Sequence, residues 1–378
     1  MKKDLILILF CSLLIKLIYV LFSIGLHDYI GKEEKLNYFA VIDVFKKNDA
    51  FWYEHIAVNG YSQIEDVKDL GYNDGSEYKQ SEWAFFPFYP LLIYVTHKLT
   101  NLNIDSSFLL LSFIFSALGF IIFYLLTRDL YGDKRKALWF TLLLIIFPFH
   151  YYFSVFYTEA VFLSCLVGAF YAILKRKYLI MSLLLIPLVL TRPNGILLLV
   201  PLYFFMLEQE NLLVNKKIKG IFKRQNVYRS IYFATGPAIF IIYCLYQKHM
   251  TGEYFAFSIA QEGWYRKFMF PLLAFFRHGD MATQFNSVYT ILFIILAIFA
   301  WKRIPLSFNI LIWISLLLPL TSGSVMSMPR FISLIFPMII FIGLQLYKLK
   351  MRWIVYVLLF FLQLCSLYFW VINHPLGY

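Results

Sequence analysis

Charged residues are scarce in this chain, because Asp, Glu, Lys and Arg make up only 15% of its 378 residues. Soluble domains carry about 25% charged residues, so a molecule that faces water on all sides is excluded. Hydrophobic residues reach 61% and aromatic residues 20%. The composition therefore predicts a polytopic membrane protein of the all-α class, since apolar runs cross a bilayer as helices.

Cysteine is also rare, and the four residues Cys11, Cys165, Cys244 and Cys365 all fall inside apolar stretches. They form no CxxC pair and show no zinc-ligand spacing, so we interpret them as packing residues. The histidines are scattered, and no HExxH motif or carboxylate pair suggests a metal site. We therefore expect no metal site.

Basic residues outnumber acidic ones and leave a formal net charge of +12. Of the 34 Lys and Arg residues, 20 lie in six short clusters between apolar segments. These clusters occupy residues 2–3, 128–136, 175–177, 216–229, 302–303 and 348–352. The pattern is typical of cytoplasmic loops under the positive-inside rule. It indicates membrane lipid as a partner and excludes nucleic acid.

We expect about 11 transmembrane helices in a single integral-membrane domain that covers residues 1–378. The expected spans are 5–24, 107–127, 137–152, 157–174, 178–191, 195–207, 229–247, 287–301, 306–320, 330–347 and 353–371. A crossing at 83–98 would break the alternation of the basic loops, so we place this segment at the outer interface. Residues 25–98 then form a large first extracytoplasmic loop.

Acidic residues gather in the first part of that loop, where 25–84 holds 12 of the 22 Asp and Glu residues. The same threading places three further polar segments on the outer side, namely 191–195, 248–286 and 321–330. We expect these segments to converge on one outward-facing cavity, because irregular backbone at membrane depth is tolerated where it lines a wet cavity.

Asp49 is the first candidate for chemistry within the acidic loop. It precedes Phe51, Trp52 and Tyr53, and His55 follows six residues later, a spacing that favours a short interfacial helix. Its carboxylate could accept a proton from a hydroxyl nucleophile. The alternative is that it caps this helix.

Arg192 and Arg330 interrupt apolar stretches, each beside a proline. A planar guanidinium suits phosphate, but either arginine could instead pair with Glu159 or act as an interfacial anchor. Glu159 begins an apolar segment, where a helix dipole favours a carboxylate, so we expect it to stabilise a helix end.

Gln261, Trp264 and Arg266 form a polar and aromatic cluster within residues 252–266. Such a cluster could stack against a sugar ring. It could equally lie in the belt of aromatic residues at the lipid headgroups.

Six stretches together resemble the PIG-V family of GPI mannosyltransferase 2-like proteins, within the GT-C superfamily of glycosyltransferases. The aromatic pair, Ile-Ala and Gly-Tyr of the first family motif follow Asp49, and Phe-Phe-Pro-x-Tyr-Pro-Leu occupies 85–91. Tyr-Thr-Glu at 157–159 and Thr-Arg-Pro-Asn-Gly at 191–195 match further motifs. The pattern at 252–264 and Pro-Arg at 329–330 complete the set. Asn48 departs from the family, which has Trp at that position.

This resemblance implies a transfer of a sugar, typically mannose, from a polyprenyl-phosphate donor on the extracytoplasmic face. It implies that Asp49 is the catalytic base. It also implies that the enzyme needs no cofactor beyond the lipid-linked substrate. We assign Arg192 and Arg330 to the donor phosphate. The candidate sugar or acceptor contacts are Trp52, His55, Glu159, Gln261, Trp264 and Arg266.

The acceptor is expected to be a glycan, a glycolipid or a protein, and the location the cell membrane of a prokaryote. The competing hypothesis is a secondary transporter or a lipid or glycolipid flippase, because the short segments 178–191 and 195–207 resemble a discontinuous helix pair. Against it, the two halves of the chain show no repeat.

Overall fold

The structure is a computed structural model that describes residues 2–29, 37–71, 79–212, 223–276 and 279–377. Within these ranges the secondary structure is helical and contains no strand. The α-helices are α1 (Lys2–Tyr29), α2 (Tyr38–Phe45), α3 (Asp49–Asn59), α4 (Phe88–Thr100), α5 (Ile104–Tyr131), α6 (Lys134–Ile146), α7 (Glu159–Leu174), α8 (Tyr178–Thr191), α9 (Leu199–Gln209), α10 (Arg224–Ile231), α11 (Thr235–Thr251), α12 (Ala256–Ala260), α13 (Met281–Ala300), α14 (Leu306–Leu320), α15 (Met328–Ser333), α16 (Phe336–Leu346) and α17 (Arg352–Val371). The 3-10 helices are η1 (Val67–Leu70), η2 (Glu82–Ala84), η3 (His150–Phe153), η4 (Pro193–Leu198), η6 (Tyr232–Ala234), η7 (Gln261–Trp264), η8 (Pro271–Phe276) and η9 (Pro375–Gly377).

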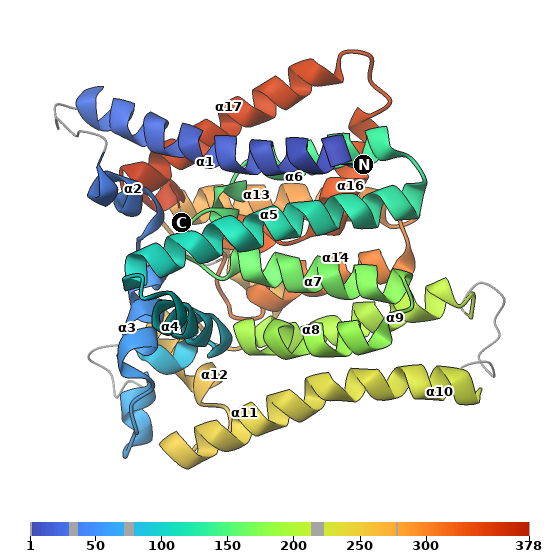
Figure 1. Ribbon diagram of the computed structural model, residues 1–378. Helices are drawn as coiled ribbons and strands as arrows, with labels where there is room; N and C mark the ends of the chain where they lie inside the picture. The colour runs from blue at the N-terminus through green and yellow to red at the C-terminus, as the bar shows by residue number, and fades with distance from the viewer. Residues whose placement is uncertain (1, 30–36, 72–78, 213–222, 277–278, 378) are drawn as a thin grey trace.

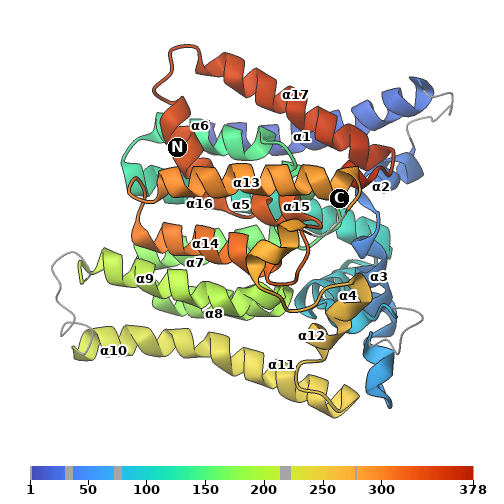
Figure 2. The ribbon, with the colours of Figure 1, turned by 180° about the vertical axis from the view of Figure 1, so that it is seen from behind.

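The long helices lie side by side in a bundle, and the shorter helices α3, α4 and α12 pack across one end of it (Figure 1). The view from behind shows the same end, with α15 lying inside the bundle near α13 (Figure 2). The described N-terminus lies at the opposite end of the bundle from the described C-terminus (Figure 1). The two ends of the bundle therefore differ, and the candidate residues lie at the end that carries α3.

Helix α7 forms the centre of the bundle. Its sequence is apolar on all sides, and nearly all of its residues are buried. A helix without a polar face is stable only when neighbours cover it completely, and here α5, α8 and α9 pack around it. The first residue of α7, Glu159, is consequently a fully buried carboxylate.

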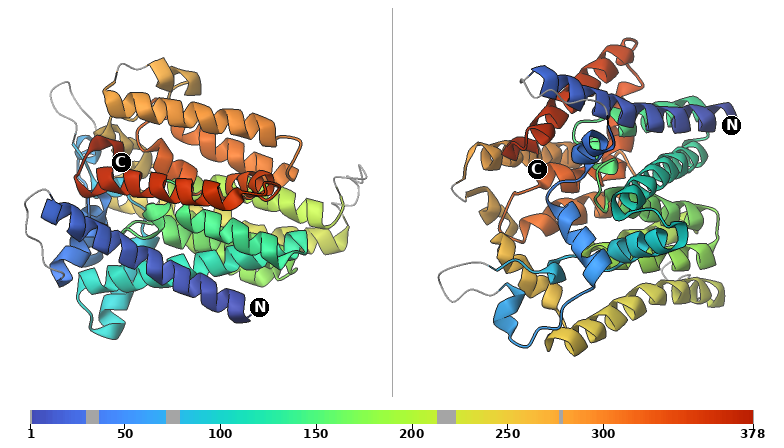
Figure 3. Two further views of the ribbon diagram at one scale, coloured as in Figure 1. Left: turned by 90° about the horizontal axis from the view of Figure 1, so that it is seen from above. Right: turned by 60° about the vertical axis from the view of Figure 1, so that its left-hand side comes forward.

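The outer helices expose apolar side chains instead. Ile6 on α1, Ile241 on α11, Val288 on α13 and Phe361 on α17 are all exposed, and α1 and α17 lie across the near side of the bundle in the left panel of Figure 3. Exposed apolar surface of this extent is unfavourable in water but matches a lipid environment. The fold is therefore that of an all-helical membrane protein.

Five helical segments are long and apolar enough to cross a membrane. They are Lys2–His27, Ile104–Tyr131, Arg224–Thr251, Met281–Ala300 and Arg352–Val371. The helices α7, α8, α14 and α16 are apolar but shorter, and α6 and α9 span only 13 and 11 residues. Helices do occur in all eleven expected ranges. The count of eleven crossings nevertheless stays a prediction.

The turn between α5 and α6 is closed by two residues that favour helix ends. Gly132 ends α5 in the left-handed conformation with φ 65°, and Asp133 then caps α6 through the backbone N–H groups of Arg135 and Lys136. This turn and the α13–α14 and α16–α17 connections, which carry basic clusters, lie at the end of the bundle opposite α3 (Figure 1). Their placement at one end is what a positive-inside arrangement requires.

The first loop folds into short helices over its described part. The expected interfacial segment 83–98 is mostly helix α4, which starts after Pro87 and ends before Asn101, a residue with φ 56°. Helix α4 packs against α3 and α5. Residues 30–36 and 72–78 of the expected loop, and 213–222 of the basic cluster at 216–229, lie outside the described residues.

Candidate functional site

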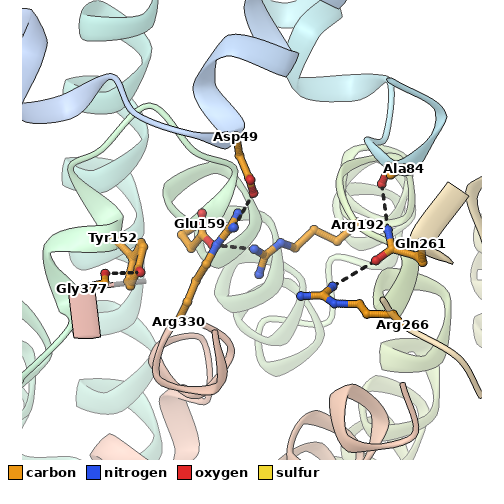
Figure 4. A network of polar contacts seen from close by, with 9 residues as sticks. All are labelled: Asp49, Ala84, Tyr152, Glu159, Arg192, Gln261, Arg266, Arg330 and Gly377. Atoms are coloured by element: carbon orange, nitrogen blue, oxygen red, sulfur yellow. Dashed lines mark hydrogen bonds and ion pairs between the residues drawn. The ribbon is translucent and has the colours of Figure 1, made fainter. Parts of the chain in front are cut away.

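Side chains from four distant segments meet at the α3 end of the bundle. Asp49 comes from α3, Glu159 from α7, Arg192 from the residue after α8, and Arg330 from α15. Three ion pairs join them into one chain that runs from Asp49 through Arg330 and Glu159 to Arg192 (Figure 4). The structure thus brings together residues that the sequence analysis singled out one by one.

Asp49 is the first residue of α3, where the helix dipole favours a negative charge. Its Oδ2 accepts a hydrogen bond from Nη1 of Arg330 at 2.5 Å, and 24% of its side chain is exposed. The preceding residue, Asn48, has φ 46° and makes no side-chain capping bond. The carboxylate of Asp49 therefore points to an arginine and keeps some access from outside the protein.

Arg330 links the two carboxylates. Besides Asp49, it contacts Oε1 of Glu159 through its Nε. Its guanidinium lies over the ring of Tyr157, with 4.2 Å from Cζ to the ring centroid. Charge-assisted hydrogen bonds and a stacked aromatic ring hold a guanidinium in one orientation, so Arg330 is oriented by three partners.

Glu159 is a counterion shared by two arginines. Its Oε1 accepts from Nη2 of Arg192 at 2.5 Å as well as from Arg330, whereas its Oε2 is buried without a hydrogen-bond partner. This pairing is the alternative that the sequence analysis left open for both arginines. The role of helix stabilisation expected for Glu159 is compatible with it, because Glu159 also occupies the first turn of α7.

Arg192 owes its position to the Thr-Arg-Pro-Asn-Gly turn. It has an extended backbone, φ −151° and ψ 149°, as a residue before proline prefers. A Cβ atom on Gly195 would lie 2.2 Å from the carbonyl oxygen of Leu188, so only glycine allows η4 to fold back this closely on α8. The Arg192 guanidinium lies near the rings of Phe162 and Phe331, and its Nη1 is buried without a partner.

A third guanidinium approaches from the connection that follows α12. Nη1 of Arg266 donates to Oε1 of Gln261 at 3.0 Å, and Nε2 of Gln261 donates to the carbonyl oxygen of Ala84 at 3.3 Å (Figure 4). The Arg266 guanidinium lies 5.6 Å from the ring of Phe331, and its Nε is buried without a partner. Burial lowers the pKa of Arg266 to about 10, so it stays charged at neutral pH.

Three aromatic rings form a wall beside this cluster. Trp52 stacks on Phe85 with ring centroids 5.7 Å apart, and Trp264 contacts both rings edge-on at 5.9 and 5.5 Å. Phe85 is buried, whereas Trp52 and Trp264 are half-buried. Partly accessible indole rings next to polar groups are suited to contact the apolar face of a sugar.

His55 does not join the cluster. It is exposed on α3, and its ring contacts Asn59 one turn further along the helix at 3.1 Å. Six residues after Asp49, it points to another side of the helix. Conversely, Phe331 was not predicted as a site residue, yet it lies against both Arg192 and Arg266. Its position directly after Arg330 was the available signal.

The charges of the cluster do not balance. Two carboxylates, Asp49 and Glu159, face three guanidinium groups, those of Arg192, Arg266 and Arg330, which leaves a net charge of +1. Burying an unpaired charge is unfavourable, and two of the arginines retain buried N–H groups without a partner. The arrangement is thus suited to bind one anion. Within the described part of the chain, no group of three or more His, Cys, Asp or Glu side chains could hold a metal ion.

Comparison with known proteins adds no assignment. A scan against protein-family models finds no match, and a search of curated proteins finds none either. The resemblance to the PIG-V family therefore rests on the motifs in the sequence alone.

Proposed function

We propose that this protein is an integral-membrane glycosyltransferase, a mannosyltransferase that takes its sugar from a polyprenyl-phosphate donor. The acceptor is a hydroxyl group of a glycan, glycolipid or protein on the extracytoplasmic face of a prokaryotic cell membrane. One observation carries the proposal: a buried cluster with a net charge of +1 and unpartnered guanidinium donors lies beside a partly exposed carboxylate.

The donor phosphate supplies the anion that the cluster lacks. Nη1 of Arg192 and Nε of Arg266 are the buried guanidinium donors without a partner, and a phosphate diester offers them two non-bridging oxygens that share one negative charge. Arg330 already forms ion pairs with Asp49 and Glu159. Its positive charge therefore stabilises the phosphate electrostatically, from the side on which Asp49 lies. This division adds Arg266 to the phosphate contacts expected from the sequence.

The sugar lies between the phosphate and the aromatic wall. Trp52 and Trp264 offer ring faces and edges to its apolar side. Gln261 is hydrogen-bonded to Ala84, which precedes Phe85 of the aromatic wall, and to Arg266. It therefore fixes the position of the wall relative to the phosphate-binding arginine Arg266. We keep His55 as an acceptor contact only for an acceptor large enough to extend along the exposed side of α3.

Asp49 acts as the general base in an inverting displacement. The acceptor O–H transfers its proton to the Asp49 carboxylate while the acceptor oxygen forms a bond to the anomeric carbon. The bond from that carbon to the phosphate oxygen breaks on the opposite face, and polyprenyl phosphate leaves with the electron pair. Arginines at the phosphate stabilise this developing charge, so no second carboxylate is needed as an acid.

A transporter or flippase is the competing function. It would require acidic or basic groups within the spans to couple movement to ions. The five charged residues of the cluster instead gather at one end of the bundle, on α3, α7, α15 and two connections (Figures 1 and 4). A site at one end of the bundle favours an enzyme that acts on one face of the membrane. It does not favour a transporter that moves a substrate through the membrane.

The phosphate contacts are tested with radiolabelled polyprenyl-phosphate mannose and the purified protein in lipid nanodiscs. Loss of a hydrogen bond to a charged group costs about 1.5–3 kcal/mol, so we expect Arg192→Met and Arg266→Met each to raise the donor KM by roughly 10–100-fold. Arg303→Met is the matched control, because Arg303 is exposed in the α13–α14 connection, which lies at the opposite end of the bundle. Unchanged donor KM values in both site variants would refute the phosphate assignment.

A further inference from the structure

The C-terminal end of α17 lies directly against the peptide that leads into Asp49. Lys47 is buried, and its Nζ donates to the carbonyl oxygens of Val371 at 2.8 Å and Trp370 at 3.3 Å. These are the last two carbonyls of α17, and they lie at the negative end of its dipole. A lysine is therefore bound where a helix end attracts a cation.

A second hydrogen bond joins the same two segments in the opposite direction. The indole Nε1 of Trp370 donates to the carbonyl oxygen of Val44 at 2.7 Å, and the Trp370 side chain is fully buried. Both ends of the segment 44–47 are thus hydrogen-bonded to α17, through Val44 at one end and Lys47 at the other. Asn48 follows with φ 46°, an uncommon conformation for a residue with a side chain, and Asp49 comes next. These contacts therefore lie immediately before the residue that enters the site.

Trp370 also lies against the aromatic residues that support Arg330. Its ring centroid is 5.7 Å from the rings of both Tyr152 and Tyr157, and Tyr157 lies under the Arg330 guanidinium. Helix α17 therefore contacts both the peptide that precedes Asp49 and the tyrosine that stacks on Arg330.

The residues after α17 fold back and complete this support. The chain turns at Asn373, with φ 56°, and a Cβ atom on Gly377 would lie 2.5 Å from the backbone nitrogen of Trp370. The hydroxyl of Tyr152 donates to the carbonyl oxygen of Gly377 at 2.8 Å (Figure 4), and Tyr151 donates to the same oxygen. The tyrosine next to Arg330 is thus fixed by the C-terminal segment.

We propose that Lys47 is a positioning residue for the transfer reaction: its bonds to the end of α17 fix where the Asp49 carboxylate stands relative to Arg330. This inference rests on the proposed role of Asp49 as base. Lys47 does not touch the substrate. It acts by holding the short peptide before Asp49, and a misplacement of about 1 Å in a catalytic group can reduce a rate by about 100-fold.

The test compares three variants in the donor assay. Lys47→Met retains the apolar stem but removes the donor to Val371, so we expect kcat to fall by roughly 10–100-fold while the donor KM changes less than about twofold. Lys47→Arg keeps a cation at the helix end and should recover most of kcat. Lys46→Met is the matched control, because Lys46 pairs with Glu54 and Asp105; it should keep kcat.

Hydrogen exchange of the backbone amides of residues 44–50 gives a readout that needs no activity. We expect faster exchange there in Lys47→Met than in Lys46→Met. Wild-type kcat in Lys47→Met, an equal loss in Lys46→Met, or a failure of Lys47→Arg to recover kcat would each overturn the inference. If the wild-type protein transfers no sugar, the proposed function fails, and the exchange data still decide whether Lys47 holds the peptide.

Discussion

Replacing Glu159 with glutamine is predicted to destabilise the protein more than any other single change in the charged cluster. Glu159 is fully buried, and its Oε1 is the common acceptor for Arg192 and Arg330. Glutamine keeps the shape and one oxygen acceptor but removes the negative charge, which raises the net charge of the cluster from +1 to +2. Breaking a buried ion pair so that a charge is left uncompensated costs about 3–5 kcal/mol.

Removal of an arginine is predicted to have a smaller effect. In Arg192→Met the net charge of the cluster falls to zero, and Oε1 of Glu159 still accepts from Arg330. In the double variant Glu159→Gln, Arg192→Met the net charge returns to +1. We therefore expect the second substitution to relieve part of the damage caused by the first, with a coupling energy of about 0.5–3 kcal/mol.

Thermal melting in detergent or nanodiscs measures this order of stabilities. Taking about 2 °C for each kcal/mol, the lower end of the range for soluble domains, the Glu159→Gln variant should melt about 6–10 °C below the wild type. Arg192→Met should lie between them. A Glu159→Gln protein that melts at the wild-type temperature, or a double variant that loses the sum of both single effects, would refute the shared-counterion account.

Two further predictions concern the turn and the topology. Gly195→Ala should prevent the close contact with Leu188 and lower the melting temperature, because overpacking costs about 1–3 kcal/mol or more; donor binding should weaken with it, whereas a Gly195→Ala protein with normal stability and KM would contradict the packing argument. In a cysteine-free background, Lys68→Cys should react with a membrane-impermeant thiol reagent in intact cells and Lys177→Cys should not. The reverse labelling pattern would invert the proposed orientation.

The helices of this protein were largely predictable, because long apolar runs leave few alternatives. Each expected span contains a helix, and breaks such as Gly132–Asp133 were marked by capping residues. The number of membrane crossings was not predictable to the same degree. Segments such as α6 and α9 are apolar enough to be taken for membrane spans. Composition alone does not distinguish a lipid-facing span from a helix such as α7, which is apolar because it is buried within the protein.

The site could be predicted as a list of residues but not as a network. Charges beside prolines in apolar surroundings identified Arg192 and Arg330, since such residues need a partner. Their partner Glu159 was named, yet nothing in its local sequence indicates that one oxygen serves two arginines. Contacts between residues far apart in the chain, such as Lys47 with Val371, leave no local pattern and require the folded structure.

The most direct test of the central claim is sugar transfer by Asp49→Asn in the purified, membrane-reconstituted protein. Asparagine keeps the shape of the side chain and can still accept a hydrogen bond from Arg330, but it cannot take the acceptor proton. General-base catalysis contributes about 10²–10⁴-fold to a rate, so we predict a fall in kcat of at least about 100-fold with nearly unchanged donor KM and a folded protein. Transfer from a polyprenyl-phosphate donor at the wild-type rate in this variant would contradict the account.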